Sequence, residues 1–163
     1  MRRMHLIPGL VLMLLLNLNT PARAQNVDRL SGTWRIVSFV TENVDTGERR
    51  NNLGDRPQGF VVFTPERRFI VLVTPAGRAS PTSDAERAQA FINKVSYSGP
   101  YTIDGNELVV VVDLAWQPSL VGTRLVRYFA LEGERLIVTS APGPSLTAGF
   151  ARARSIVTWE RVQ

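Results

Sequence analysis

The side chains of this sequence that could do chemistry include two tyrosines, one arginine and one aspartate on segments with strand character. Tyr97 and Tyr101 stand four residues apart, with Gly99 between them. In an extended strand both phenols project from one face, because side chains alternate with a period of two. Such a pair can line a cavity and offer a ligand an apolar ring with a polar tip. The alternative is core packing, in which each hydroxyl donates to a backbone carbonyl.

Arg127 alternates with Leu125 and Phe129 along another strand-like segment. If this face points inward, the guanidinium enters an apolar interior, where an unpaired charge is costly. It then needs a carboxylate partner, for which Asp113 is a candidate, or the anionic group of a ligand. On an inward face, Asp113, Arg127 and Phe129 are therefore candidate ligand contacts. The alternative is that Arg127 points to solvent.

Two further residues are candidate ligand contacts if the domain is hollow. Trp116 lies in a connection that includes Gln117 and Pro118, and loops on a rigid scaffold often contact ligands. The alternative is that this indole folds down over the rim of the domain. Ser38 shares one face of the alternating segment 33–40 with Trp34, so it is predicted to line the same interior.

Catalytic chemistry is restricted by the residues that are missing. The chain has no Cys, and its one His, His5, lies in a segment expected to be removed. A Ser-His-Asp triad, a thiol nucleophile and a His or thiolate zinc site are therefore excluded from the mature chain. No catalytic residue, metal or cofactor is assigned. Asp113 with Tyr97 or Tyr101, transferring protons in an isomerase or cyclase, is the enzymatic alternative.

Residues 1–24 have the pattern of a secretory signal peptide. Arg2 and Arg3 give a basic start, an apolar run follows over 6–16, and Ala22-Arg23-Ala24 forms a small-x-small cleavage site. The run is too short for a membrane anchor, since the ~30 Å hydrocarbon core needs ~20 residues. The sequence thus predicts a periplasmic or secreted protein, without a transmembrane span after processing.

Processing changes the composition of the chain. Removing 24 of the 163 residues leaves 139, which suits a single domain over 25–163. Three of the 19 basic residues leave with the signal, so 16 face 14 acids and the formal charge falls from +5 to about +2. This removes the main argument for nucleic acid binding. With no Cys to form disulfides, stability must come from apolar burial.

The elements that must position these residues are mainly short strands. Alternation and turn residues predict eight strands, at 33–40, 59–64, 69–74, 97–103, 107–114, 122–131, 135–140 and 154–161. Asp104-Gly105-Asn106 and Glu132-Gly133-Glu134 predict hairpins, whereas 41–57 is predicted as a turn-rich loop. A capping box of Ser83 and Glu86 starts one short helix over 83–94, expected to cross an opening or side of the sheet. The fold class is therefore all-β: an eight-stranded antiparallel up-and-down barrel or a sandwich, with one short α-helix.

An ordered series of motifs resembles the bacterial and fungal lipocalin-like domain family, of calycin-like β-barrel type. The matching segments are Leu30-Ser31-Gly32-Thr33-Trp34, Pro57-Gln58-Gly59-Phe60, Tyr97-Ser98-Gly99-Pro100-Tyr101, Val121-Gly122-Thr123, Arg127-Tyr128-Phe129, Leu131-Glu132-Gly133-Glu134 and Trp159-Glu160-Arg161. The resemblance implies that the eight strands form a barrel around a central cavity. It also implies that Trp34 closes one end with Arg161 stacked on it, a structural contact. Members often carry a histidine where this chain has 110–113, so activity that needs that imidazole is not expected here.

The sequence therefore predicts an exported barrel that binds a small hydrophobic or amphipathic ligand. The cavity would take the ligand's apolar body, and Arg127 or a Tyr hydroxyl its polar end. Besides the cavity enzyme, the other alternative is an envelope interaction module with a filled barrel. The run 108–112, hydrophobic on both faces, suits either helix cover or a partner surface. The sequence is compatible with a homodimer.

Overall fold

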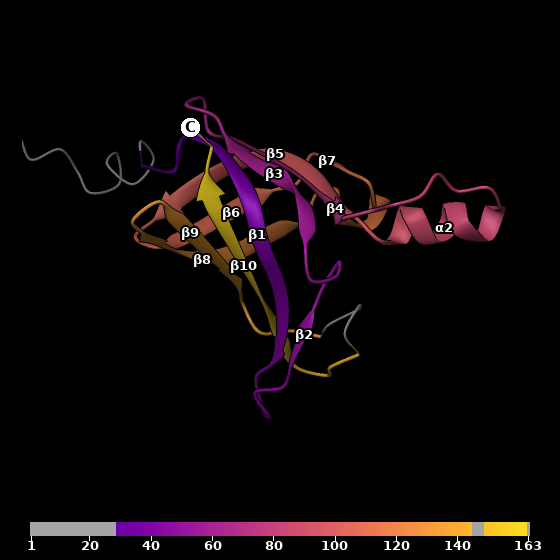
Figure 1. Ribbon diagram of the computed structural model, residues 1–163. Helices are drawn as coiled ribbons and strands as arrows, with labels where there is room; N and C mark the ends of the chain where they lie inside the picture. Colours follow the sequence, from indigo (N-terminus) through magenta and orange to yellow (C-terminus); the bar gives the residue numbers. More distant parts are fainter. Residues whose placement is uncertain (1–28, 145–148, 163) are drawn as a thin grey trace, which may run out of the picture.

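Eight antiparallel strands close into a barrel in the computed structural model, which describes residues 29–144 and 149–162 (Figure 1). The predicted signal peptide, residues 1–24, lies outside the described residues. The barrel strands are β1 (Gly32–Asn43), β3 (Pro57–Phe63), β4 (Arg68–Pro75), β5 (Val95–Asp104), β6 (Glu107–Val111), β8 (Arg124–Glu132), β9 (Arg135–Ser140) and β10 (Ala153–Arg161). They confirm the eight predicted strands and the hairpin turns between them.

Closure comes from pairing of the first strand with the last. β1 pairs with β3 on one side and with β10 on the other, with Trp34 opposite Arg161 and Phe39 opposite Val157. The remaining strands follow in the order β3, β4, β5, β6, β8, β9 and β10. A closed sheet leaves its long strands without free edges and gives every strand an inner and an outer face. The predicted barrel is confirmed over the predicted alternative of a sandwich.

Short elements accompany the barrel strands. β2 (Arg49–Asn51) pairs with β1 inside the stretch predicted as a loop, and β7 (Leu114–Ala115) pairs with β5. The fifth predicted strand, 107–114, ends at Val111 rather than at residue 114, because Asp113 N–H donates to the Ser98 carbonyl of β5 instead. A single 3₁₀ turn, η1 (Pro118–Leu120), follows.

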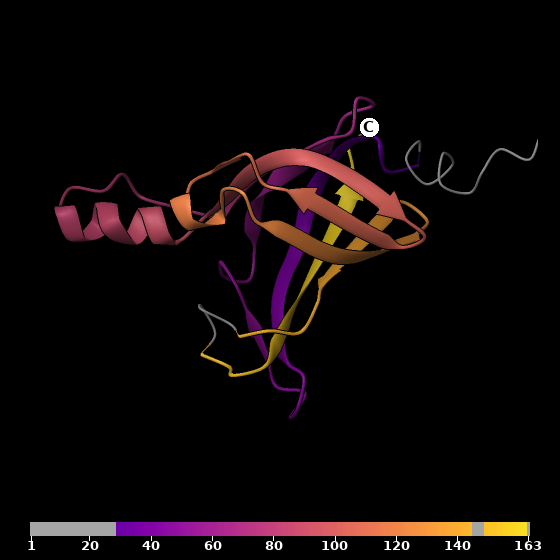
Figure 2. The ribbon, with the colours of Figure 1, turned by 180° about the vertical axis from the view of Figure 1, so that it is seen from behind.

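The predicted helix is α2 (Asp84–Ile92), and both halves of its capping box are present. Ser83 Oγ accepts from the Glu86 amide at 3.2 Å, and the Glu86 carboxylate accepts from the Ser83 amide at 3.1 Å. The helix extends away from one end of the barrel and buries none of its residues (Figures 1 and 2). Phe91 and Ile92 remain exposed at its last turn.

The predicted faces of the first strand are wrong beyond Ile36. A β-bulge shifts the register between Ile36 and Ser38, so the inward positions move by one residue. Trp34 and Ile36 point to the core as expected, but Phe39 then takes the inward position in place of Ser38. An extra residue on one strand has this effect because side chains alternate with a period of two.

One end of the barrel is filled by aromatic packing. Trp34, which is 1% exposed, donates from Nε1 to the Leu30 carbonyl at 2.9 Å. The Arg161 guanidinium lies 4.1 Å from the centroid of its ring, which confirms the stacking implied by the resemblance. Phe63 packs edge-on against both Phe69 and Tyr101, at centroid distances of 5.3 and 5.4 Å. These side chains form the floor beneath the space in the barrel's other half.

A buried carboxylate ties together the ends of β1, β2 and β10. Glu42, which is 7% exposed, forms ion pairs with Arg49 and Arg154, each at 2.6 Å. Hydrogen bonds from these two guanidinium groups hold the pKa of Glu42 below its ordinary value, against the opposing effect of its burial.

We expect Glu42→Gln to make stability less dependent on pH. A folded pKa below the unfolded value stabilises the fold above the unfolded pKa, near 4.5, and this contribution disappears as pH falls through the folded pKa. The variant should thus be less stable than wild type at neutral pH, and the difference should shrink in acid. Urea denaturation followed by circular dichroism, at neutral pH and again in acid, measures the free energy of unfolding of both proteins. Glu48→Gln, at an exposed pair with Arg50, is the matched control with little expected effect. A gap that stayed constant with pH would contradict the argument.

Candidate ligand-binding cavity

The barrel encloses a cavity of about 840 Å³, open at the end that carries α2 and η1. Its volume lies within the range of ~300–1,000 Å³ found for small-molecule sites. The walls are mainly aliphatic and aromatic side chains from the inner faces of the strands. The apolar lining comprises Phe39, Leu53, Val61, Phe63, Phe69, Val71, Val73, Val95, Leu108, Leu125, Val138, Val157 and Trp159. The interior is thus hollow above its aromatic floor.

Three of the seven sequence candidates line this cavity. Tyr97 comes from β5, Arg127 from β8, and Trp116 from the connection between β7 and η1. Trp116 is half-buried at the entrance, beside Gln117 and Leu120. Arg127 faces inward, which decides between its two predicted orientations. The three residues line one cavity. Their contact with a ligand stays a prediction.

Three other candidates lie outside the lining for separate reasons. Ser38 is displaced by the bulge in β1. Tyr101, 2% exposed, belongs to the aromatic floor, and its hydroxyl donates to the Thr64 carbonyl at 3.4 Å. Phe129 is also buried in the core below the cavity. The inward face of a filled end gives core packing, so for Tyr101 the packing alternative describes the structure, and Phe129 is packed in the same core.

Asp113 lies on the outside of the barrel wall. Its carboxylate pairs with Arg68 at 2.7 Å and accepts from Ser98 Oγ at 3.0 Å. Partial burial opposes ionisation, but the hydrogen bonds from Arg68 and Ser98 outweigh it and lower the pKa of Asp113. Ser98 alternates with Tyr97 on β5, so the aspartate and that phenol face opposite sides of the wall. The predicted Asp113–Arg127 pair and the predicted Asp–Tyr proton-transfer pair are therefore both wrong.

Tyr97 and Arg127 both bring polar groups to the walls of the cavity. The Tyr97 ring stacks on Phe69 with centroids 5.3 Å apart. Burial raises the pKa of its hydroxyl, and the Arg127 guanidinium, through its charge and a hydrogen bond, opposes part of that rise. Arg127 Nη1 also donates to the Val126 carbonyl at 2.8 Å. The phenol and the guanidinium thus stand together among apolar side chains.

Sequence reasoning missed the residues at the entrance. Phe91, Ile92 and Lys94 at the end of α2 border the opening, and Lys94 Nζ lies 4.6 Å from the Phe91 ring centroid. The alternation of Ser155, Val157 and Trp159 on the last strand was a usable signal for the wall. No local pattern distinguishes the helix end as part of an entrance, since the arrangement depends on where the helix joins the barrel.

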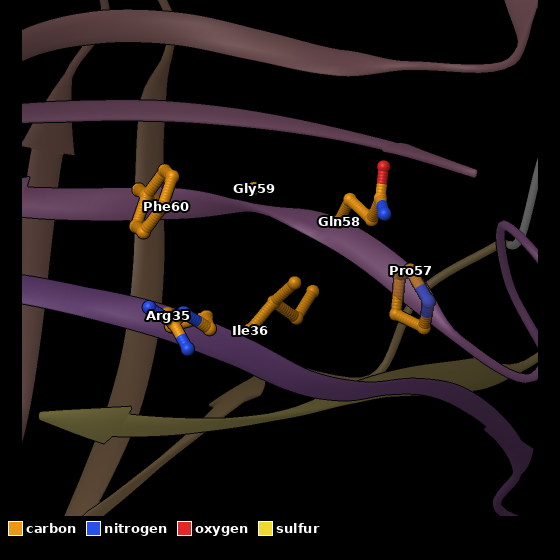
Figure 3. A pocket seen from close by; sticks show the side chains of 6 residues that line it. All are labelled: Arg35, Ile36, Pro57, Gln58, Gly59 and Phe60. Atoms are coloured by element: carbon orange, nitrogen blue, oxygen red, sulfur yellow. The ribbon is translucent and has the colours of Figure 1, made fainter. Parts of the chain in front are cut away.

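A second, smaller hollow of about 390 Å³ lies on the outer surface between β1 and β3. Its lining is Arg35, Ile36, Pro57, Gln58, Gly59 and Phe60 (Figure 3). Gly59 belongs to this lining, and β4 passes so close to it that a Cβ there would lie 2.0 Å from the Leu72 carbonyl oxygen. Arg35, 5.9 Å from the Phe60 ring centroid, is its one charged residue. The interior cavity is therefore the better candidate site.

The fold and its interior define an up-and-down β-barrel with a cavity of ligand size. The profile of the Lipocalin-like domain matches residues 31–162, and the chain belongs to this family. Among curated proteins, no sequence matches this chain. Within residues 29–144 and 149–162, no helix is long and apolar enough to cross a membrane. The same residues contain no group of three or more His, Cys, Asp or Glu side chains placed to hold a metal ion.

Proposed function

We propose that this protein is exported and binds a small hydrophobic or amphipathic ligand inside its barrel. The observation that carries the proposal is the apolar cavity of about 840 Å³, open at one end. A ligand there exchanges contact with water for contact with aliphatic and aromatic walls, worth ~25 cal/mol per Å² of apolar surface buried. Export rests on the signal pattern of residues 1–24.

The hollow interior favours a binding protein over the two alternatives. The interaction module was predicted with a filled barrel, whereas this barrel contains an open apolar cavity. A cavity enzyme based on Asp113 would need that carboxylate inside, and it is paired with Arg68 outside. Placement of Tyr97, Trp116 and Arg127 around one space supports their role in ligand contact.

We expect Val138→Trp to weaken ligand binding by about tenfold or more, ~1.4 kcal/mol. Val138 is half-buried and lines the cavity, so a larger ring there occupies the space that a ligand needs. Titration with an environment-sensitive apolar fluorescent dye measures the affinity. Val37→Trp places the same ring on the exposed outer face of β1 and should leave dye binding unchanged.

Native mass spectrometry of the protein recovered from the exporting cell tests both halves of the proposal. The mass of the chain should correspond to residues 25–163, and a bound molecule should add mass that organic solvent removes. A wild-type protein that takes up neither dye nor any cellular lipid would overturn the binding function. A retained segment 1–24 would overturn the export proposal alone.

A further inference from the structure

We propose that the ligand is an amphipathic anion and that Arg127, with Tyr97, binds its anionic group inside the barrel. This inference rests on the proposed function and adds the chemical class of the ligand. The head group is a carboxylate or another small anionic oxygen group, and the tail is apolar.

The charges on the cavity lining are all of one sign. Lys94 at the entrance and Arg127 within the wall are its two cations, and no Asp or Glu occurs among the described residues that line it. A charge surrounded by apolar side chains is costly unless a counter-charge or hydrogen bonds compensate it. The cavity is therefore suited to an anionic guest and unfavourable for a cationic one.

Arg127 differs from the arginines that form ion pairs. Among residues 29–144 and 149–162, six arginines pair with a carboxylate, namely Arg49, Arg50, Arg68, Arg87, Arg152 and Arg154. Arg127 takes part in none of these pairs, and Asp113, the acid expected for it, is bound to Arg68. Among the described residues, the acceptors at the Arg127 guanidinium are thus neutral groups, the Val126 carbonyl and the Tyr97 hydroxyl.

The geometry at Arg127 suits an oxyanion. A guanidinium has five N–H donors in a planar fork, and a carboxylate can accept two of them side by side. The Tyr97 hydroxyl next to it can donate a further hydrogen bond to the same anion. Both groups lie on apolar walls, so the interaction would be weakly screened by water.

The position along the strand leaves room for a tail. Arg127 lies on β8 between Leu125, which also lines the cavity, and Phe129 in the buried floor. In the sheet it is flanked by Leu108 and Ser140. A head group held at this depth has apolar side chains such as Val71, Val138 and Val157 within the same cavity to cover an alkyl or ring system.

The test compares three ligands that share one tail: dodecanoate, dodecanol and dodecyltrimethylammonium. Each displaces the apolar dye from the processed protein at neutral pH. Wild type should bind dodecanoate about tenfold or more tightly than dodecanol, and the ammonium compound most weakly. Arg127→Met should abolish the preference for the carboxylate and keep the affinity for the alcohol. Tyr97→Phe should reduce the preference to a smaller extent.

Two control variants locate the effect. Arg124→Met removes an exposed charge from the same strand and should leave the preference intact. Lys94→Met removes the cation at the entrance and should leave most of the preference for the carboxylate. Thermal denaturation monitors folding, and Arg127→Gln replaces Arg127→Met if the latter does not fold.

Equal binding of acid and alcohol by wild type would overturn the inference and leave the binding function standing. A preference that survives Arg127→Met, or that disappears with Lys94→Met instead, would overturn the assignment to Arg127. If neither the dye nor any of the three ligands binds to the wild-type protein, the proposed function fails.

Discussion

Trp34→Ala will lower the free energy of unfolding by about 3–5 kcal/mol, the usual cost of removing a large aromatic side chain from a core. The indole is almost completely buried, and its N–H donates to the Leu30 carbonyl. Truncation leaves a void at the filled end of the barrel and an unsatisfied carbonyl beside it. It also removes the ring on which Arg161 stacks, a contact worth ~0.5–2 kcal/mol.

Urea denaturation followed by circular dichroism measures this change. Trp116→Ala is the matched control, because that indole is half-buried at the cavity entrance and makes no comparable packing contact. We expect its loss to be below about 1 kcal/mol, within the range of changes away from the core. Similar losses for the two variants would show that Trp34 does not stabilise the closed end as argued.

Gly99→Ala will destabilise the barrel by about 3 kcal/mol, at the upper end of the range for overpacking. A Cβ at this position would lie 1.9 Å from the Val111 carbonyl oxygen and 3.2 Å from the Val112 Cα. Both are backbone atoms of the neighbouring segment, which cannot rotate away as a side chain could. The added methyl group must therefore push the end of β6 away from β5.

Gly143→Ala provides the control for the glycine substitution. No heavy atom lies within 4 Å of the position that its Cβ would take, and its φ is outside the left-handed region. This variant should unfold at nearly the wild-type urea concentration. A Gly99→Ala protein as stable as Gly143→Ala would mean that β5 and β6 can separate at little cost.

The two predictions concern the scaffold, and they bear on the site because β5 and β8 carry Tyr97 and Arg127. Loosening β5 at Gly99 would move the Tyr97 ring relative to the guanidinium. Damage at Trp34 acts on the floor and leaves the upper wall in place. For the same loss in free energy of unfolding, we therefore expect Gly99→Ala to lower the affinity for the dye more than Trp34→Ala does.

The elements of this protein follow from local sequence signals. Period-two alternation, turn residues such as Asp104-Gly105-Asn106, and the capping box at Ser83 act over a few residues, so each is readable without the rest of the chain. The resemblance to the lipocalin-like domain family added the stacking of Arg161 on Trp34, a contact between the last strand and the first.

Only the tertiary structure decided which faces meet inside. Alternation separates the two faces of a strand, but the choice between them depends on partners distant in the sequence. One bulge between Ile36 and Ser38 moved Phe39 into the cavity and Ser38 out of it. Arg127 turned inward, whereas its expected partner Asp113 turned outward and paired with Arg68. Sequence therefore determined the strands and the export pattern, while closure of the barrel determined the cavity and the charge within it.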